Sequence, residues 1–176
     1  MRRLALVVAA ALAAGCATRP TPPPPPAKPR PATPVQPLPG VISPATYVAQ
    51  AASIDLLVIR SSELALVRSP SRGIRDFASR MIAAHQGLAA QLSFAGRRLN
   101  LLPSAAMLPQ HQAMYDALDS SGDFDNAYVR LQRRSHGAAL SLHSEYAARG
   151  TSPTLRPVAE NGTAVERSHL DMLRRL

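Results

Sequence analysis

Proline is distributed very unevenly along this chain, and its distribution limits which part can fold. Twelve of the 17 prolines lie at or before Pro44, and only five follow it. Five are consecutive, at positions 22–26. Proline lacks a backbone N–H and has a fixed φ, so a segment this rich in proline cannot form a helix or an interior strand. We therefore expect an extended segment before Pro44 and a folded domain after it.

The first 15 residues have the parts of a secretory signal peptide. Arg2 and Arg3 supply positive charge, residues 4–12 are all apolar, and small residues lead to Cys16. Such a short apolar run cannot span a bilayer as a helix. Residues 12–16, Leu-Ala-Ala-Gly-Cys, resemble the lipobox of bacterial lipoproteins, in which the cysteine is lipidated before cleavage. We predict a signal peptide over 1–15 and a lipid anchor on Cys16.

The lipid anchor and the Pro-rich segment together predict where the protein is held. Residues 16–43 are expected to form a disordered polyproline II tether after the lipidated cysteine. In lipoprotein signals, an Asp after the cysteine favours the inner membrane, and this chain has Ala17. We therefore expect an exported lipoprotein on the periplasmic face of the outer membrane, with the membrane as its partner through Cys16. This single cysteine cannot form an internal disulfide.

The domain over 44–176 has the composition and periodicity of an all-α fold. Aromatic residues make up only 4% of the chain and there is no Trp, which favours helices over a sandwich or barrel. Apolar residues recur at helical spacing over 44–68, from about 72 to 102, over 109–118, from about 123 to 149, and from 152 to the end. We predict an antiparallel four-helix bundle with a short extra helix between the second and third long helices. Pro157 and Gly162 leave the continuity of the last helix open.

Charge and motifs exclude several classes of function. The formal charge is +9, but five basic residues precede Pro44, which leaves 15 basic against 11 acidic residues beyond it. There is no basic stripe interleaved with stacking aromatics, so no nucleic-acid partner is expected. A phosphate-binding glycine loop is also lacking, and we expect no enzymatic activity. Arginines at 97–98 and 130–134 leave an anionic envelope partner as a weaker alternative.

Several segments of the domain resemble one bacterial family. They are residues 75–85 (Arg-Asp-Phe-Ala-Ser-Arg-Met-Ile-Ala-Ala-His), residues 118–128 (Leu-Asp-Ser-Ser-Gly-Asp-Phe-Asp-Asn-Ala-Tyr), His136, and His169-Leu170. These segments are similar to domain of unknown function 4142. The resemblance covers about 47–176 and implies an exported, often outer-membrane, protein with a ferritin-like four-helix bundle.

The chain departs from this family at positions where its members usually carry other residues. The family has acids where this chain has Val58, Ala84 and Ser135, and a Leu-Pro pair where it has Thr163-Ala164. The three replacements of acids leave fewer carboxylates for any metal centre of that fold.

Three histidines and one glutamate are the candidate metal ligands. A helix turns about 100° per residue, which places His85 and His169 on the apolar stripes of their helices. Glu166 precedes His169 by three residues on the same face, a Glu-x-x-His pair of the kind that ferritin-like carboxylate sites use. His136, on the flank of its helix, is a fourth candidate. These residues either bind a transition metal ion or form a hydrogen-bonded polar cluster in the core.

The number of carboxylates favours the polar cluster. A dinuclear iron site needs about four carboxylates. Asp55 is expected at the edge of its stripe, Glu63 points away from the core, and Val58 replaces the family acid. His143 and His111 are expected at the surface or rim. We thus predict an envelope lipoprotein whose bundle has a structural or binding role and no cofactor; the alternative is a metal-binding or redox protein using His85, Glu166 and His169.

Overall fold

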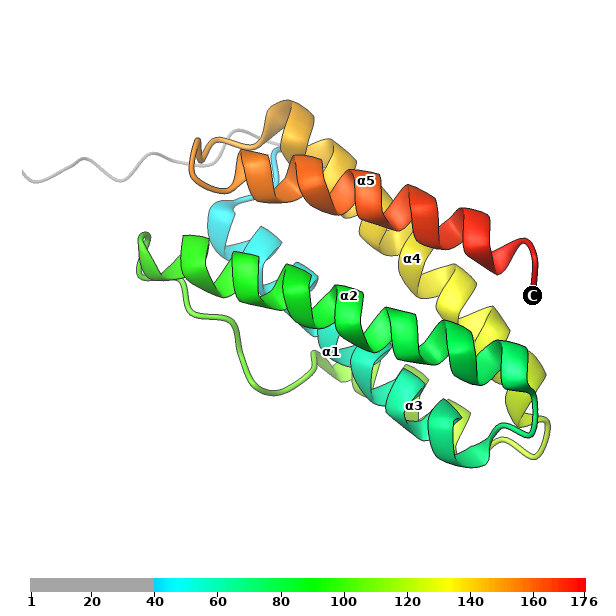
Figure 1. Ribbon diagram of the computed structural model, residues 1–176. Helices are drawn as coiled ribbons and strands as arrows, with labels where there is room; N and C mark the ends of the chain where they lie inside the picture. Colours follow the sequence, from blue (N-terminus) through cyan, green and yellow to red (C-terminus); the bar gives the residue numbers. More distant parts are fainter. Residues whose placement is uncertain (1–39) are drawn as a thin grey trace, which may run out of the picture. The chain divides into compact units, whose positions relative to one another are not determined.

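The computed structural model describes residues 40–176, which contain five α-helices and no strand (Figure 1). The four long helices are α1 (Pro44–Arg68), α2 (Arg72–Arg97), α4 (Phe124–Arg149) and α5 (Arg156–Leu173), and the short helix is α3 (Pro109–Asp119). The predicted four-helix bundle with a short extra helix is therefore confirmed. The predicted signal peptide, the lipid anchor on Cys16 and nearly all of the tether lie outside the described residues.

The four long helices form a closed ring. Helix α1 packs against α2 and α4, and α5 packs against the same two helices from the opposite corner. Short connections make α1–α2 and α4–α5 antiparallel hairpins, whereas the longer connection from α2 to α4 carries α3 along the outside of α1 and α4 (Figure 1). Neighbours in the ring run antiparallel, so the bundle has one central core lined by all four long helices.

Local sequence signals set the ends of α1 and α2. The Ser43 hydroxyl accepts a hydrogen bond from the Thr46 N–H at 3.1 Å, and Ser71 caps α2 through the Ile74 N–H at 3.4 Å. Helix α2 ends at Arg97, before the predicted end near position 102. A Cβ at position 96 would overlap the carbonyl oxygen of Leu101. Only glycine therefore allows the chain to reverse direction at this point.

Helix α5 is continuous from Arg156 to Leu173. Pro157 lies in its first turn, where proline removes no helical hydrogen bond, so no kink results. The helix begins a few residues later than the predicted start at 152–153. Gly162 is buried and faces α4, and a Cβ at this position would lie only 2.8 Å from the His143 ring. This glycine lets α4 and α5 approach closely.

The predicted apolar stripes form the core. Every stripe residue predicted on α1 is buried, and so is the α2 stripe up to Ala95. Tyr47 of α1 stacks on Tyr146 of α4 with ring centroids 4.0 Å apart. Two residues also expected on the apolar stripes, Ala138 of α4 and Leu176 at the end of the chain, are exposed.

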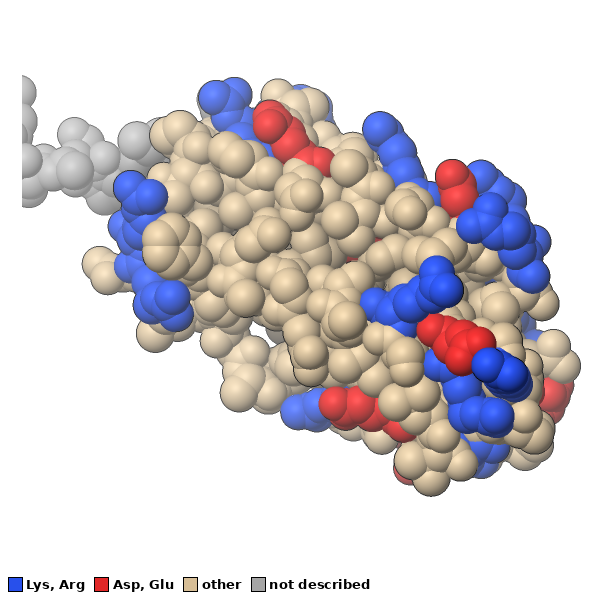
Figure 2. Space-filling model, in the orientation of Figure 1, with Lys and Arg blue, Asp and Glu red and all other residues tan. Residues whose placement is uncertain are grey.

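Charged side chains are distributed over the outside of the bundle. On the face shown in Figure 2, basic side chains lie mainly towards the two ends, and acidic side chains lie beside them in several places. None of the helices within residues 40–176 is both long enough and apolar enough to cross a membrane.

Candidate metal centre

Three imidazoles and one carboxylate converge in the middle of the bundle. His85 comes from α2, His136 from α4, and Glu166 and His169 from α5, and all four are buried. The three ring centroids form a triangle with sides of 5.1 to 5.3 Å. One potential ligand atom from each residue lies within 4.8 Å of those of the other three.

Helix α1 reaches this cluster through Asp55. The Asp55 Oδ1 lies 2.8 Å from the Nδ1 of His85, and the two groups share one proton. The same contact turns the Nε2 of His85 towards the centre, where it has no hydrogen-bond partner. A cation bound at Nε2 would place the shared proton on Nδ1 and leave Asp55 as a carboxylate, the arrangement usual for histidine ligands.

His136 is oriented by its own helix. Its Nδ1 donates to the backbone carbonyl of Gln132, one turn earlier, at 2.8 Å. Its Nε2 therefore points into the bundle, towards Glu166 Oε2 at 3.9 Å and Met81 Sδ at 3.2 Å. As with His85, a hydrogen bond at Nδ1 leaves Nε2 available to a ligand.

Glu166 and His169 have polar atoms without partners. Both carboxylate oxygens of Glu166 are buried without a hydrogen bond, although His85 Nε2 lies 3.8 Å from Oε1. The Nδ1 of His169 is also buried and unpartnered. Buried polar atoms are normally satisfied, and an unsatisfied one costs about 1–3 kcal/mol. With His85 Nε2, four such atoms belong to three residues of the cluster, which leaves these residues able to take up a ligand.

Burial holds these groups in their neutral forms. It raises the pKa of Glu166 to about 9, with a smaller contribution from the charge of Asp55, and it raises the pKa of Asp55 well above its ordinary range. Burial also lowers the pKa of His85 to about 4. The pKa values of His136 and His169 fall to about 3 and about 4, first by burial and then by repulsion from His85. Neutral imidazoles are the form that binds metal ions, whereas Glu166 has to release its proton to become a ligand.

The donor set fits a single first-row transition metal ion. Nitrogen and oxygen ligands at 2.0–2.2 Å from a tetrahedral ion lie about 3.3–3.5 Å apart. The separations of 3.8 and 3.9 Å to Glu166 would therefore have to contract by about half an ångström, and the widest separation in the set, up to 4.8 Å, by about 1.3 Å. A dinuclear iron centre does not fit, since Asp55 and Glu166 are the only buried acidic residues in 40–176.

Asp55 and Met81 are the contributors that sequence reasoning missed. Asp55 was expected at the edge of the α1 stripe, but it is 3% exposed and contacts His85. It follows Ala51 by four residues and precedes Val58 by three, so its spacing did place it on the buried face. Met81 precedes His85 by one turn on α2, which is the signal that could have identified it.

The prediction for His143 was wrong. It was expected at the surface, but it is 5% exposed and its Nδ1 lies 3.0 Å from the hydroxyl of Tyr47. Burial and the nearby His85 lower its pKa to about 4. The close approach of α4 to Gly162 of α5 covers the His143 ring. His111 lies at the rim as expected, half-buried, with its Nδ1 2.7 Å from the Ser53 hydroxyl.

The positions that depart from the family pattern take other roles here. Val58 is fully buried in the α1 core, and the inward carboxylate of α1 comes from Asp55, one turn earlier. Ser135 is buried beside His136 on α4, and its hydroxyl has no hydrogen-bond partner.

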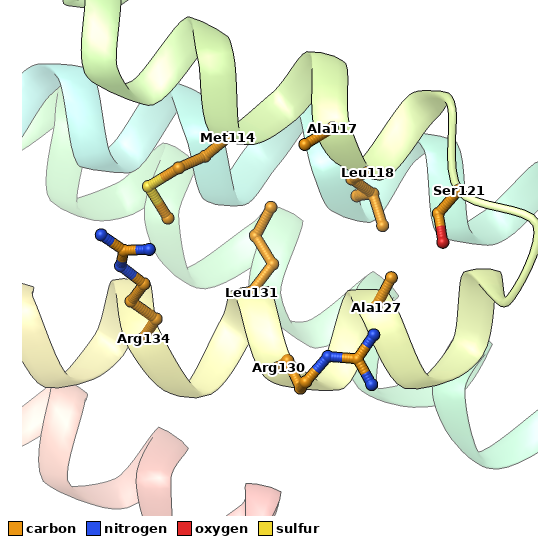
Figure 3. Close-up of a pocket in the computed structure, with 8 residues that line it drawn as sticks. All are labelled: Met114, Ala117, Leu118, Ser121, Ala127, Arg130, Leu131 and Arg134. Carbon is orange, nitrogen blue, oxygen red and sulfur yellow. The ribbon is translucent and has the colours of Figure 1, made fainter.

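A surface groove between α3 and α4 is separate from the buried cluster. The Met114, Leu118 and Leu131 side chains line it, and the guanidinium groups of Arg130 and Arg134 border it (Figure 3). It is lined by no acidic residue, histidine or cysteine. Arg97 and Arg98 lie at the end of α2 and do not line this groove, so the arginines singled out in the sequence do not share it.

The fold and the cluster define this chain as a four-helix bundle protein with a buried histidine–carboxylate centre. It belongs to the family described as Domain of unknown function (DUF4142), whose model matches residues 27–176. The resemblance noted in the sequence is thereby confirmed, and the match begins within the Pro-rich segment, earlier than expected. Among proteins of curated function, none matches this chain in sequence.

Solved structures share the fold at low sequence identity. CopM in the Cu(II)-bound form is 14% identical, with a TM-score of 0.65; the alignment covers 77% of this chain and 95% of CopM. The CopM structure in the Cu(I)-bound form aligns with a TM-score of 0.63, also at 14% identity, and covers 76% of this chain and 94% of CopM. A DUF305 fragment from Deinococcus radiodurans is 18% identical, with a TM-score of 0.64; the alignment covers 76% of this chain and 96% of the fragment. These similarities establish the fold.

Proposed function

We propose that the helical domain binds one transition metal ion at the centre of the bundle. The ligands are the Nε2 atoms of His85 and His136, a carboxylate oxygen of Glu166 and a ring nitrogen of His169. The observation that carries the proposal is the convergence of buried ligand atoms from four residues, three of which have polar atoms without a hydrogen-bond partner. This reverses the preference for a polar cluster that the count of carboxylates favoured.

The hydrogen-bond pattern supports metal binding over a structural polar cluster. A structural cluster would be expected to pair its members with each other. Here His85 and His136 bond outward, to Asp55 and to the Gln132 carbonyl, and leave Glu166 unbonded. Outward partners on the Nδ1 atoms with free Nε2 atoms inside are what a metal centre requires.

The similarity to CopM supports the proposal in one respect. CopM, which shares this fold, has been solved in copper-bound and silver-bound forms. The assignment of ligands in this chain rests on its own side chains.

Metal content of the purified chain tests the proposal. The chain is prepared without an affinity tag, incubated with Cu(II) or Zn(II), desalted, and measured by elemental analysis. We expect one tightly held ion per chain in the wild type, and loss of that ion in H169A and in E166Q. The second variant keeps the size of the side chain, so it guards against simple misfolding of the first.

The variant H111A is the matched control. His111 is a half-buried histidine that contacts Ser53 and lies outside the cluster. H111A should retain the metal. A wild-type chain that is folded by circular dichroism but keeps neither ion after desalting would overturn the proposal.

We further propose that this domain works in the bacterial envelope as a lipoprotein. The support is in the sequence, where a positively charged start, an apolar run and small residues precede Cys16. Two or three acyl chains on one cysteine would hold the domain stably at a membrane. The chain would then place a metal-binding bundle in the periplasm, at the outer membrane, with the Pro-rich segment as a spacer.

A further inference from the structure

The sulfur of Met81 is part of the buried cluster. Its Sδ lies 3.2 Å from His136 Nε2, and both side chains are fully buried. Met81 and His85 lie one turn apart on α2, so the thioether approaches the centre from the same helix as the His85 ring.

This contact brings two electron-pair donors together without a proton between them. The Nδ1 of His136 faces a carbonyl oxygen, which can only accept, so Nδ1 carries the proton of the neutral ring. Its Nε2 then presents a lone pair, and a thioether sulfur has lone pairs but no hydrogen. Neither atom can donate a hydrogen bond to the other, and a cation would satisfy both.

The distance fits two ligands on one metal ion. A nitrogen at about 2.0 Å and a sulfur at about 2.3 Å from the same ion lie about 3.2–3.5 Å apart at near-tetrahedral angles. The observed 3.2 Å is already in that range, whereas the distances to Glu166 are longer. Of these three distances, only the one between Met81 Sδ and His136 Nε2 already matches two ligands on one ion.

We propose that Met81 Sδ is an additional ligand of the central ion, and that it makes the centre selective for Cu(I) over Zn(II). This inference rests on the proposed metal centre. Thioether sulfur is a soft donor that favours Cu(I), whereas imidazole suits copper and zinc alike. Without the sulfur, the remaining histidines and glutamate would lack a donor that distinguishes Cu(I).

The test compares Cu(I) and Zn(II) affinities of the purified full-length chain with those of M81L. Cu(I) affinity is measured without oxygen by competition with bicinchoninate, and Zn(II) affinity by competition with a coloured chelator. Leucine keeps the volume and apolar character of methionine, so the core should remain packed. We expect M81L to weaken Cu(I) binding by about ten-fold or more, the usual scale for loss of one group at a metal site, and to leave Zn(II) binding unchanged.

A second buried methionine provides the control. Met107, in the connection before α3, is buried but outside the cluster, and M107L should bind both ions as the wild type does. X-ray absorption at the copper edge adds a second readout: the Cu(I)-loaded C16S chain, which lacks the one thiol of the sequence, should show a sulfur neighbour at about 2.3 Å.

The outcomes separate the two proposals. If the wild type binds ions but M81L binds Cu(I) equally well, or if no sulfur neighbour is seen, the role of Met81 is refuted and the metal centre stands. If the wild type binds neither ion, the metal centre fails as well.

Discussion

Substitution of Glu166 by Gln should change how the stability of the metal-free domain depends on pH. Glu166 is fully buried, and its pKa in the folded chain is about 9 against an ordinary value of 4.5. Between these values the folded state keeps a proton that the unfolded state has lost. A rise in pH therefore favours unfolding across this window.

The size of the effect follows from linkage. One proton contributes about 1.4 kcal/mol per pH unit to the free energy of unfolding. Between about pH 6.5 and pH 8.5 the wild type should therefore lose about 3 kcal/mol of stability through Glu166 alone. The buried histidines act in the opposite direction: burial lowers their folded pKa values to about 3–4 against an ordinary 6.5, so they destabilise the fold where the unfolded chain holds their protons. This penalty fades as the pH rises through 6.5, and it is the same in the wild type and in E166Q. Burial also raises the pKa of Asp55, which makes its contribution the same in sign as that of Glu166.

Urea unfolding followed by circular dichroism, with a chelator present, measures this dependence. Over the two pH units the wild-type midpoint should fall by about 1–2 M urea more than that of E166Q, given the usual denaturant sensitivity of small domains. The glutamine variant cannot ionise, so its decline should be smaller by the contribution of one proton. E160Q, at an exposed position on α5, should follow the wild type. Parallel profiles for wild type and E166Q would refute the assignment of Glu166 as a buried, proton-holding carboxyl.

Three further predictions concern the packing and the anchor. Y47F removes the hydroxyl that contacts the buried Nδ1 of His143 and should cost about 1–3 kcal/mol of stability in urea unfolding, with metal content unchanged. G162A should cost about 1–3 kcal/mol because its Cβ would collide with the His143 ring, whereas G137A, with open space around it, should be neutral or stabilise the domain by up to about 1 kcal/mol. C16S should move the protein from the membrane fraction to the soluble fraction on cell fractionation, and continued membrane association would contradict lipidation.

The family resemblance and the helices could be predicted from sequence because both depend on the order of neighbouring residues along the chain. The spacing of apolar residues gave α1 its observed limits of Pro44 and Arg68, and serine and proline marked where it starts. The end of α2 was placed too late, because the reversal at Gly96 depends on the carbonyl of Leu101 folding back over it. The periodicity of α2 contains no information about that contact.

The composition of the cluster could be predicted only in part. His85, His136, Glu166 and His169 were identified as candidates from stripe positions, and the bundle brings them together. Asp55 was underestimated, since a residue near the edge of a stripe becomes buried only when a neighbouring helix covers that edge. Helix α2 covers the edge of α1 that carries Asp55, and it brings the ring of His85 to the Asp55 carboxyl group.

The sequence by itself determined the class of fold, the helical segments, the lack of enough acidic residues for a dinuclear iron centre, and a short set of candidate ligands. Only the tertiary structure decided which way each ring faces and which donor atoms remain unbonded. The physical reason is that periodicity gives the direction of a side chain around its own helix, whereas hydrogen bonds and ligand distances depend on how four helices are placed against each other. The contact of Met81 in α2 with His136 in α4, two residues 55 positions apart in sequence, exists only in the packed bundle.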